Sequence, residues 1–157
     1  MADMLVSLLK LPEVEDDVER LRAEGIIIRR ARALERSVVR RYMLDRWSET
    51  WADEADMAFS FQPPSIFLAT HEKKIIGFGC YECTCRNFFG PTGVNEEYRG
   101  RGIGRVLLVQ CLMAMREMGY AYAIIGGVGP VEFYSRTVGA VLIPDSTPGI
   151  YTDMLER

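Results

Sequence analysis

The sequence has few of the residues from which several enzyme classes build their sites. Its 157 residues include one histidine, His71, and four cysteines. A single histidine cannot form an H-E-x-x-H zinc motif, and no G-x-S-x-G stretch occurs, so metalloprotease and serine hydrolase chemistry has no support. Cys80, Cys83 and Cys85 fall on one predicted strand, with Cys83 and Cys85 on the same face and no tight turn of a metal knuckle. We therefore expect reduced thiols and no bound metal.

Long apolar runs and a strong net charge are also missing. The apolar stretch at 4–11 is too short to span a bilayer, is interrupted by Ser7 and Lys10, and follows no basic leader. We therefore expect no membrane contact and a cytoplasmic location. The formal net charge of −3 argues against a nucleic-acid partner, although the arginine-rich stretch at 29–46 keeps an RNA-linked acceptor open.

The length and the 48% apolar content are those of one globular domain covering residues 1–157. Periodicity and Gly/Pro signals predict helices at 13–24, 31–46, 48–60, 102–119 and 130–138, and strands at 25–29, 65–70, 75–85, 88–94, 122–128, 141–143 and 149–155. Residues 1–24 are predicted to be a helical extension of this domain. Hairpins followed by crossover helices indicate an α/β (α+β) fold, with a mixed, mostly antiparallel central sheet and helices on both faces.

The most informative segment joins the strand at 88–94 to the helix at 102–119. Its residues 99–105, the glycine–arginine corner, are Arg99, Gly100, Arg101, Gly102, Ile103, Gly104 and Arg105. Glycines at a helix entrance let backbone N–H groups converge, and the helix start adds unpaired N–H groups and a positive dipole end. With three arginines nearby, the corner is typical of a pyrophosphate site. Its spacing matches neither the G-x-G-x-x-G dinucleotide fingerprint nor the P-loop.

The corner resembles the first motif of the GNAT superfamily of N-acetyltransferases. Residues 99–104 match the R/Q-x-x-G-x-G/A signature, and Val94 stands at the usual distance upstream. Phe133 and Tyr134, followed by Gly139, look like the second motif, and the resemblance extends from about residue 25 to the C-terminus. The sequence departs from the family where proline, asparagine and phenylalanine are common, at Glu96, Gly127 and Ala140.

This resemblance implies acetyl-coenzyme A as the acyl donor and a primary amine as the acceptor, with direct attack of the amine on the thioester. The pyrophosphate would lie on the N–H groups of the corner, and the Val94 N–H would face the thioester carbonyl. Tyr134 fills the position of the acid that protonates the leaving thiolate. The residues expected to bind the coenzyme are Val94, Arg99, Gly100, Arg101, Gly102, Ile103, Gly104 and Arg105.

The acceptor must lose a proton, because a primary amine is mostly protonated at pH 7. Glu82, Glu96 and Glu97 are the candidate bases. We choose Glu82, because its predicted strand would flank the site, whereas the other two lie close to the corner.

The acceptor itself, a small molecule, amino acid or peptide, would be selected by residues 31–64 and the last strands. There, aromatic residues either line a pocket or pack in the core, and acidic residues either attract a cationic amine or form a solvated face. These residues are Trp47, Trp51, Phe59, Phe61, Glu49, Asp53 and Asp56. Two other functions stay open: an acyl-coenzyme A sensor without turnover, and an acetyltransferase for an aminoacyl-tRNA-type amine. A homodimer is a further option.

Overall fold

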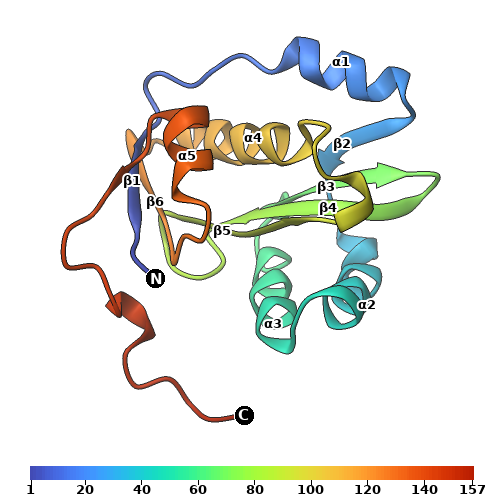
Figure 1. The fold of residues 1–157 in the computed structure, drawn as a ribbon. Coiled ribbons are helices and arrows are strands. Elements are labelled where there is room, and N and C mark those ends of the chain that lie inside the picture. Colours follow the sequence, from blue (N-terminus) through green and yellow to red (C-terminus); the bar gives the residue numbers. More distant parts are fainter.

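The computed structural model describes all residues from 1 to 157 (Figure 1). Its strands are β1 (Met4–Ser7), β2 (Ile26–Arg30), β3 (Ile66–His71), β4 (Lys74–Tyr81), β5 (Phe88–Val94), β6 (Tyr122–Ile125) and β7 (Val141–Leu142). Its helices are α1 (Glu15–Ala23), α2 (Arg36–Arg46), α3 (Glu49–Ala58), α4 (Ile103–Glu117) and α5 (Val131–Val138). Short 3-10 turns cover Ala33–Glu35, Glu96–Tyr98 and Gly149–Tyr151.

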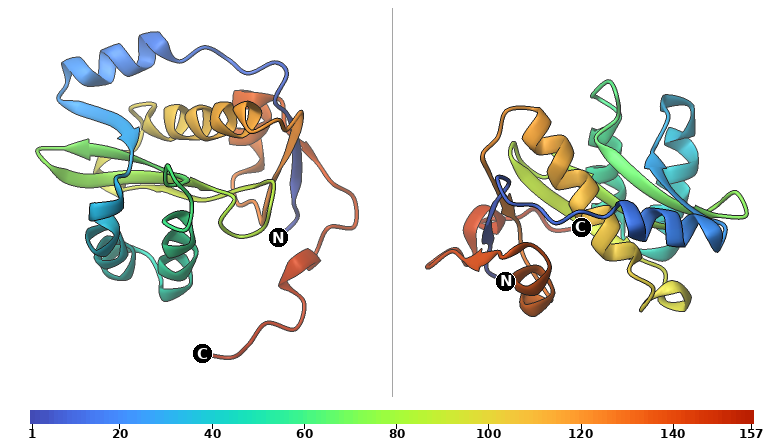
Figure 2. Two further views of the ribbon diagram at one scale, coloured as in Figure 1. Left: turned by 180° about the vertical axis from the view of Figure 1, so that it is seen from behind. Right: turned by 90° about the horizontal axis from the view of Figure 1, so that it is seen from above.

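All the strands join one sheet, in the order β2-β3-β4-β5-β6-β1-β7. Every neighbouring pair is antiparallel except β5 and β6, which run parallel. Helices α1, α4 and α5 lie on one side of the sheet, and α2 and α3 cover the other (Figures 1 and 2). The prediction of a mixed, mostly antiparallel sheet with helices on both faces is confirmed.

Each face of the sheet buries its own apolar core. A cluster of 25 buried residues, with Leu107 and Leu112 of α4 among them, fills the space between the sheet and α4. A cluster of 11 buried residues lies between the sheet and the α2–α3 pair. Ala52, Ala55 and Ala58 recur at helical spacing on α3 and are fully buried, so this helix approaches the sheet closely. No helix is both long enough and apolar enough to cross a membrane.

The N-terminal segment is not the helical extension that the sequence predicts. Helix α1 is present, but Met4–Ser7 forms strand β1, which lies between β6 and β7 in the sheet. Met4 and Val6 are buried and Leu5 is exposed, which is the alternation of a strand. The pattern covers only four residues, so the apolar residues Leu8 and Leu9 hide it in the sequence.

Two predicted strands end or fail for local reasons. The strand predicted at 75–85 stops at Tyr81, because Glu82 adopts a left-handed conformation with φ of 62°. Cys83 and Cys85 therefore lie in a loop, and their predicted placement on one strand face is wrong. The strand predicted at 149–155 is also wrong: Gly149–Tyr151 is a 3-10 turn, and no strand pairs with this segment.

Candidate functional site

The sheet opens between its two parallel strands. β5 pairs with β6 only through Phe88 with Ile124 and Phe89 with Ile125. β6 ends at Ile125, and the chain beyond it turns to the N-terminal segment, where the Val128 N–H donates to the Ala2 carbonyl. β5 continues to Val94, so its residues 90–94 have no strand partner on the β6 side. We call this stretch the open edge of β5.

The open edge presents two backbone donors. The Asn95 N–H donates to the Ile76 carbonyl at 2.8 Å, which fixes the alternation of hydrogen bonds between β4 and β5. In this register, the N–H groups of Val94 and Thr92 point away from β4 and toward the open side. The family resemblance implies this direction for Val94 but says nothing of Thr92, because the register of a hairpin cannot be read from composition alone.

At the end of β5, the glycine–arginine corner leads into α4. Gly100 and Gly102 have φ of 81° and 84°, conformations that favour glycine. No side chain caps the helix, and its first backbone bond runs from the Val106 N–H to the Gly102 carbonyl. The N–H groups of Ile103, Gly104 and Arg105 therefore have no partner within the helix. Together with the helix dipole, these groups form a site for an anion.

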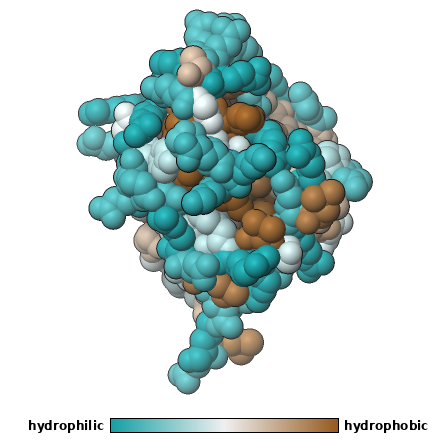
Figure 3. Space-filling model, turned by 90° about the vertical axis from the view of Figure 1, so that its right-hand side faces the viewer, coloured by the Kyte–Doolittle hydropathy of each residue, from teal (hydrophilic) through white to brown (hydrophobic).

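The arginines of the corner are not equivalent. Arg99 donates through Nε to the Val94 carbonyl at 3.2 Å, and the Arg101 guanidinium lies 5.1 Å from the centre of the Tyr98 ring. Neither forms an ion pair, whereas Arg105 pairs with Asp17 of α1 at 3.5 Å. Two exposed guanidinium groups thus remain for a ligand. In the view from the side at which α4 begins, the surface is mainly hydrophilic, with hydrophobic side chains visible between the polar ones (Figure 3).

Helix α1 adds a cation that the sequence does not predict. Arg20 donates to the carbonyl of Arg101 at 3.0 Å, and its guanidinium lies 3.0 Å from where a side chain at Gly102 would begin. The two residues are 81 positions apart, and no spacing rule relates them. Arg20 holds the corner in shape, and any residue larger than glycine at position 102 would crowd it.

Tyr134 lies where β5 and β6 part. Its ring packs edge-on against Phe89, the last β5 residue paired with β6, at 6.3 Å between centroids, and against Phe133 at 5.1 Å. Burial raises the pKa of the Tyr134 hydroxyl to about 12. Since burial is the sole cause of this shift, no charged partner favours the phenolate, and the group remains a proton donor at neutral pH.

The structure does not bring Glu82 to the corner. Glu82 follows β4 at the opposite end of β5 from Val94, and the seven residues of β5 from Phe88 to Val94 span about 20 Å. Its Oε1 accepts from the Asn87 N–H at 2.6 Å, and its Oε2 accepts from the Tyr120 hydroxyl at 3.2 Å. Both carboxylate oxygens thus hold the loop at 82–87 in place.

The face of the open edge toward α2 and α3 is aromatic. Trp47 lies against Gly93, where a Cβ atom would come within 2.7 Å of the indole ring. Trp51 stacks on Trp47 at 5.1 Å, and both meet Phe78 edge-on. Both tryptophans are half-buried, so they belong to the core on one side and leave part of their surface accessible. Phe59 packs against the same core, whereas Phe61 lines a separate cavity of about 520 Å³ that also contains Glu82.

The cysteines are buried or half-buried and none is bonded to another. Burial raises the pKa of the Cys80 and Cys111 thiols, which disfavours the reactive thiolate form. No group of three or more histidine, cysteine, aspartate or glutamate side chains is arranged to hold a metal ion.

Comparison with known proteins matches residues 35–139 to the family model described as Acetyltransferase (GNAT) family. The chain also resembles solved structures, although a search of the curated proteins finds no match. A GCN5-related glucosamine N-acetyltransferase region of a fungal multi-domain β-N-acetylglucosaminidase superposes with a TM-score of 0.72 at 16% identity, over 90% of this chain and 19% of that one.

Two bacterial GCN5-related N-acetyltransferases are also similar. The Sphaerobacter thermophilus protein has a TM-score of 0.63 at 18% identity, and the match covers 90% of this chain and 48% of that one. The Kribbella flavida protein has a TM-score of 0.53 at 14% identity, covering 90% and 53%. The chain thus spans from about a fifth to about half of the length of these solved chains. At such identities the likeness concerns the fold.

Proposed function

The chain belongs to the acetyltransferase (GNAT) family, and from this premise we propose that it transfers an acetyl group from acetyl-coenzyme A to a primary amine. The observation that carries the proposal is the glycine–arginine corner: unpaired N–H groups at the start of α4 lie beside Arg99 and Arg101, which have no carboxylate partner. These donors fit a diphosphate, whose several oxygens each need a hydrogen-bond donor or a positive charge.

The open edge of β5 suits the thioester end of the coenzyme. The N–H groups of Val94 and Thr92 are fixed in direction by the pairing of β5 with β4. Negative charge develops on the carbonyl oxygen during acyl transfer, and a preorganised backbone donor stabilises it by about 3 kcal/mol. Val94 would serve as this donor, as the resemblance implies, and Thr92 supplies the next N–H along the strand.

The chemical step moves the acetyl group directly from sulfur to nitrogen. The neutral amine attacks the carbonyl carbon, so that a C–N bond forms and the C–S bond breaks. The excess proton on nitrogen passes to water, while Tyr134 gives its hydroxyl proton to the departing sulfur and recovers one from solvent. Since the pKa of Tyr134 is raised to about 12, its hydroxyl is protonated whenever the thiolate leaves at neutral pH. We assign proton removal to water rather than to Glu82, because both Glu82 oxygens already accept hydrogen bonds.

The test combines coenzyme binding with release of free thiol. Calorimetric titration with coenzyme A should show saturable binding, and acetyl-coenzyme A should release thiol when one member of a panel of primary amines is present. Absence of coenzyme binding would overturn the proposal. Saturable binding without thiol release from any amine would replace it with the sensor function.

A further inference from the structure

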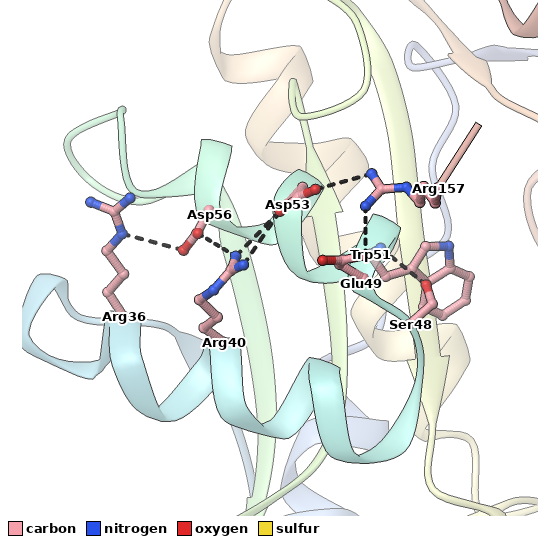
Figure 4. A network of polar contacts seen from close by, with 8 residues as sticks. All are labelled: Arg36, Arg40, Ser48, Glu49, Trp51, Asp53, Asp56 and Arg157. Atoms are coloured by element: carbon pink, nitrogen blue, oxygen red, sulfur yellow. Dashed lines mark hydrogen bonds and ion pairs between the residues drawn. The ribbon is translucent and has the colours of Figure 1, made fainter. Parts of the chain in front are cut away.

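Helix α3 carries four acidic side chains, and three of them are neutralised by arginines (Figure 4). Their ion pairs are Glu49 with Arg157 at 3.0 Å, Asp53 with Arg157 at 3.0 Å and Arg40 at 3.4 Å, and Asp56 with Arg40 at 2.6 Å and Arg36 at 3.3 Å. The fourth, Glu54, forms no ion pair. It is thus the one carboxylate of the helix whose charge the protein leaves uncompensated.

Glu54 is half-buried rather than solvated. Its Oε1 accepts a hydrogen bond from the Thr84 hydroxyl at 2.5 Å, and no group of the protein donates to Oε2. Burial raises the pKa of the carboxyl, and the Thr84 bond offsets this in part. A half-buried carboxylate without a cation is costly, so the site would gain from a positively charged ligand.

Glu54 lies beside the aromatic face of the open edge, on the side of the loop at 82–87 to which Thr84 belongs. It follows Trp51 by one turn of α3, and Trp51 stacks on Trp47, which lies against Gly93 of β5. The other side is closed by Tyr151, whose ring lies 3.4 Å from where a side chain at Gly127 would begin, just beyond β6. Burial raises the pKa of Tyr151, and the nearby Glu54 charge contributes to the shift. The carboxylate therefore lies near Trp51 of the aromatic face, Thr84 of the loop before β5 and Tyr151.

We propose that Glu54 binds the ammonium group of the acceptor, and that the acceptor is a primary amine on an aromatic or apolar body without a carboxylate of its own. This inference rests on the proposed acetyl transfer. The half-buried faces of Trp47 and Trp51 suit an aromatic body and, beside Glu54, also attract a cation. An α-amino acid would place its carboxylate near Glu54, where like charges repel.

The pair 2-phenylethylamine and phenylalanine tests this choice, because they share the aromatic body and the amine and differ in the carboxylate. Neither contains an indole, so binding can also be followed through Trp47 and Trp51, the only two tryptophans of the chain. The wild-type protein should show saturable changes in tryptophan emission with 2-phenylethylamine, and a KM for it at least tenfold below that for phenylalanine.

Glu54→Gln should raise the KM and the fluorescence Kd for 2-phenylethylamine at least tenfold, with the KM for acetyl-coenzyme A unchanged. Glu49→Gln is the matched control, since its carboxylate already has Arg157 as a partner. Unchanged amine affinity in Glu54→Gln, or equal affinity for amine and amino acid in the wild type, would overturn the inference while leaving acetyl transfer intact. Binding of the amine that depends on Glu54, without any acetyl transfer, would support the inference and contradict the proposed reaction.

Discussion

The glycine–arginine corner and helix α3 each contain charged side chains with ion-pair partners and charged side chains without them, but the unpaired charges of the two regions have opposite signs. At the corner, Arg105 is paired with Asp17, and Arg99 and Arg101 are left without an acid. On α3, three acids are paired with arginines, and Glu54 is left without a cation. The uncompensated charge is positive at one end of the open edge and negative beside its aromatic face. Where a protein leaves charges unpaired shows which ligand charge each region can accept, a phosphate at the corner and an ammonium beside α3.

Substitution of Tyr134, which lies where β5 and β6 part, should show the largest effect. Tyr134→Phe removes the hydroxyl that protonates the leaving sulfur, so we expect turnover to fall by roughly 100-fold. Coenzyme affinity should stay near the wild-type value, because the ring packing on Phe89 and Phe133 is kept. Steady-state kinetics and calorimetry measure both. Tyr122→Phe, on the exposed side of β6, is the control, and equal turnover in the two variants would remove Tyr134 from the mechanism.

Reversing a charge at the corner should give the next largest effect. Arg101→Glu places a carboxylate where a diphosphate would bind, and we expect the Kd for coenzyme A to rise by about 10-fold or more. Arg41→Glu makes the same change at an exposed position of α2 that has no ion pair, and it should leave the Kd unchanged. If both variants bind the coenzyme alike, then net charge rather than the corner governs binding, and the contrast between the two regions fails.

The aromatic face can be tested through Gly93. Gly93→Ala directs a methyl group to within 2.7 Å of the Trp47 ring, which Trp51 and Phe78 hold in place. Overpacking of this kind costs about 1–3 kcal/mol, and we expect a lower Tm. Gly129→Ala is the control, because nothing lies within 4 Å of its added methyl group. A Tm equal to that of Gly129→Ala would show that Trp47 moves freely, and the face would then not be preformed.

The smallest expected effect is a change in Tm that depends on pH, and its sign is opposite for substitutions of Glu54 and Asp53. Burial is the main cause that raises the pKa of Glu54 in the folded protein. The folded state therefore binds this proton more tightly than the unfolded state does, which stabilises the fold at low pH. This stabilisation is lost as the pH rises through the folded-state pKa. Glu54→Gln should therefore raise the Tm slightly at pH 7.5 and leave it unchanged at pH 4 or below. The pKa of Asp53 is lowered, chiefly by its bond with Arg157, so Asp53→Asn should instead lower the Tm slightly at pH 7.5. Thermal melts at the two pH values give the comparison, and shifts of the same sign would refute it.

The corner is one continuous segment, whereas the site on α3 is built from distant segments, and this difference explains why the sequence predicts the first and not the second. The corner lies within residues 94–105, so its glycines and arginines are visible as a pattern, and β5 and α4 begin and end close to the predicted positions. The site on α3 combines residues of α3 with Thr84 and Tyr151, which come together only through tertiary packing. The sequence gives no reason to prefer Glu54 over its three acidic neighbours, because their arginine partners lie on other segments.

The surroundings of Gly127, where the sequence departs from the family pattern, are also visible only in the structure. Gly127 has φ of 53°, and its N–H donates to Asp3 Oδ1 at 2.8 Å. Tyr151 lies 3.4 Å from where a side chain at Gly127 would begin, so the asparagine of the family pattern would contact this ring. Asp3 and Tyr151 are distant from Gly127 in the sequence, so the sequence of residues 122–128 does not show that they are its neighbours. The hydrogen-bond partners of Glu82, the Asn87 N–H and the Tyr120 hydroxyl, likewise follow from the tertiary fold and are not visible in the sequence.

Strand β1 has a consequence for synthesis of the protein on the ribosome. Met4–Ser7 must find Tyr122–Ile125, so its partner is made about 120 residues later. At a translation rate of about 5–20 residues per second, the first strand waits on the order of ten seconds. During that interval the apolar side chains of Met4, Val6 and Leu8 have no sheet to cover them, and a chaperone that binds emerging chains would find its substrate there.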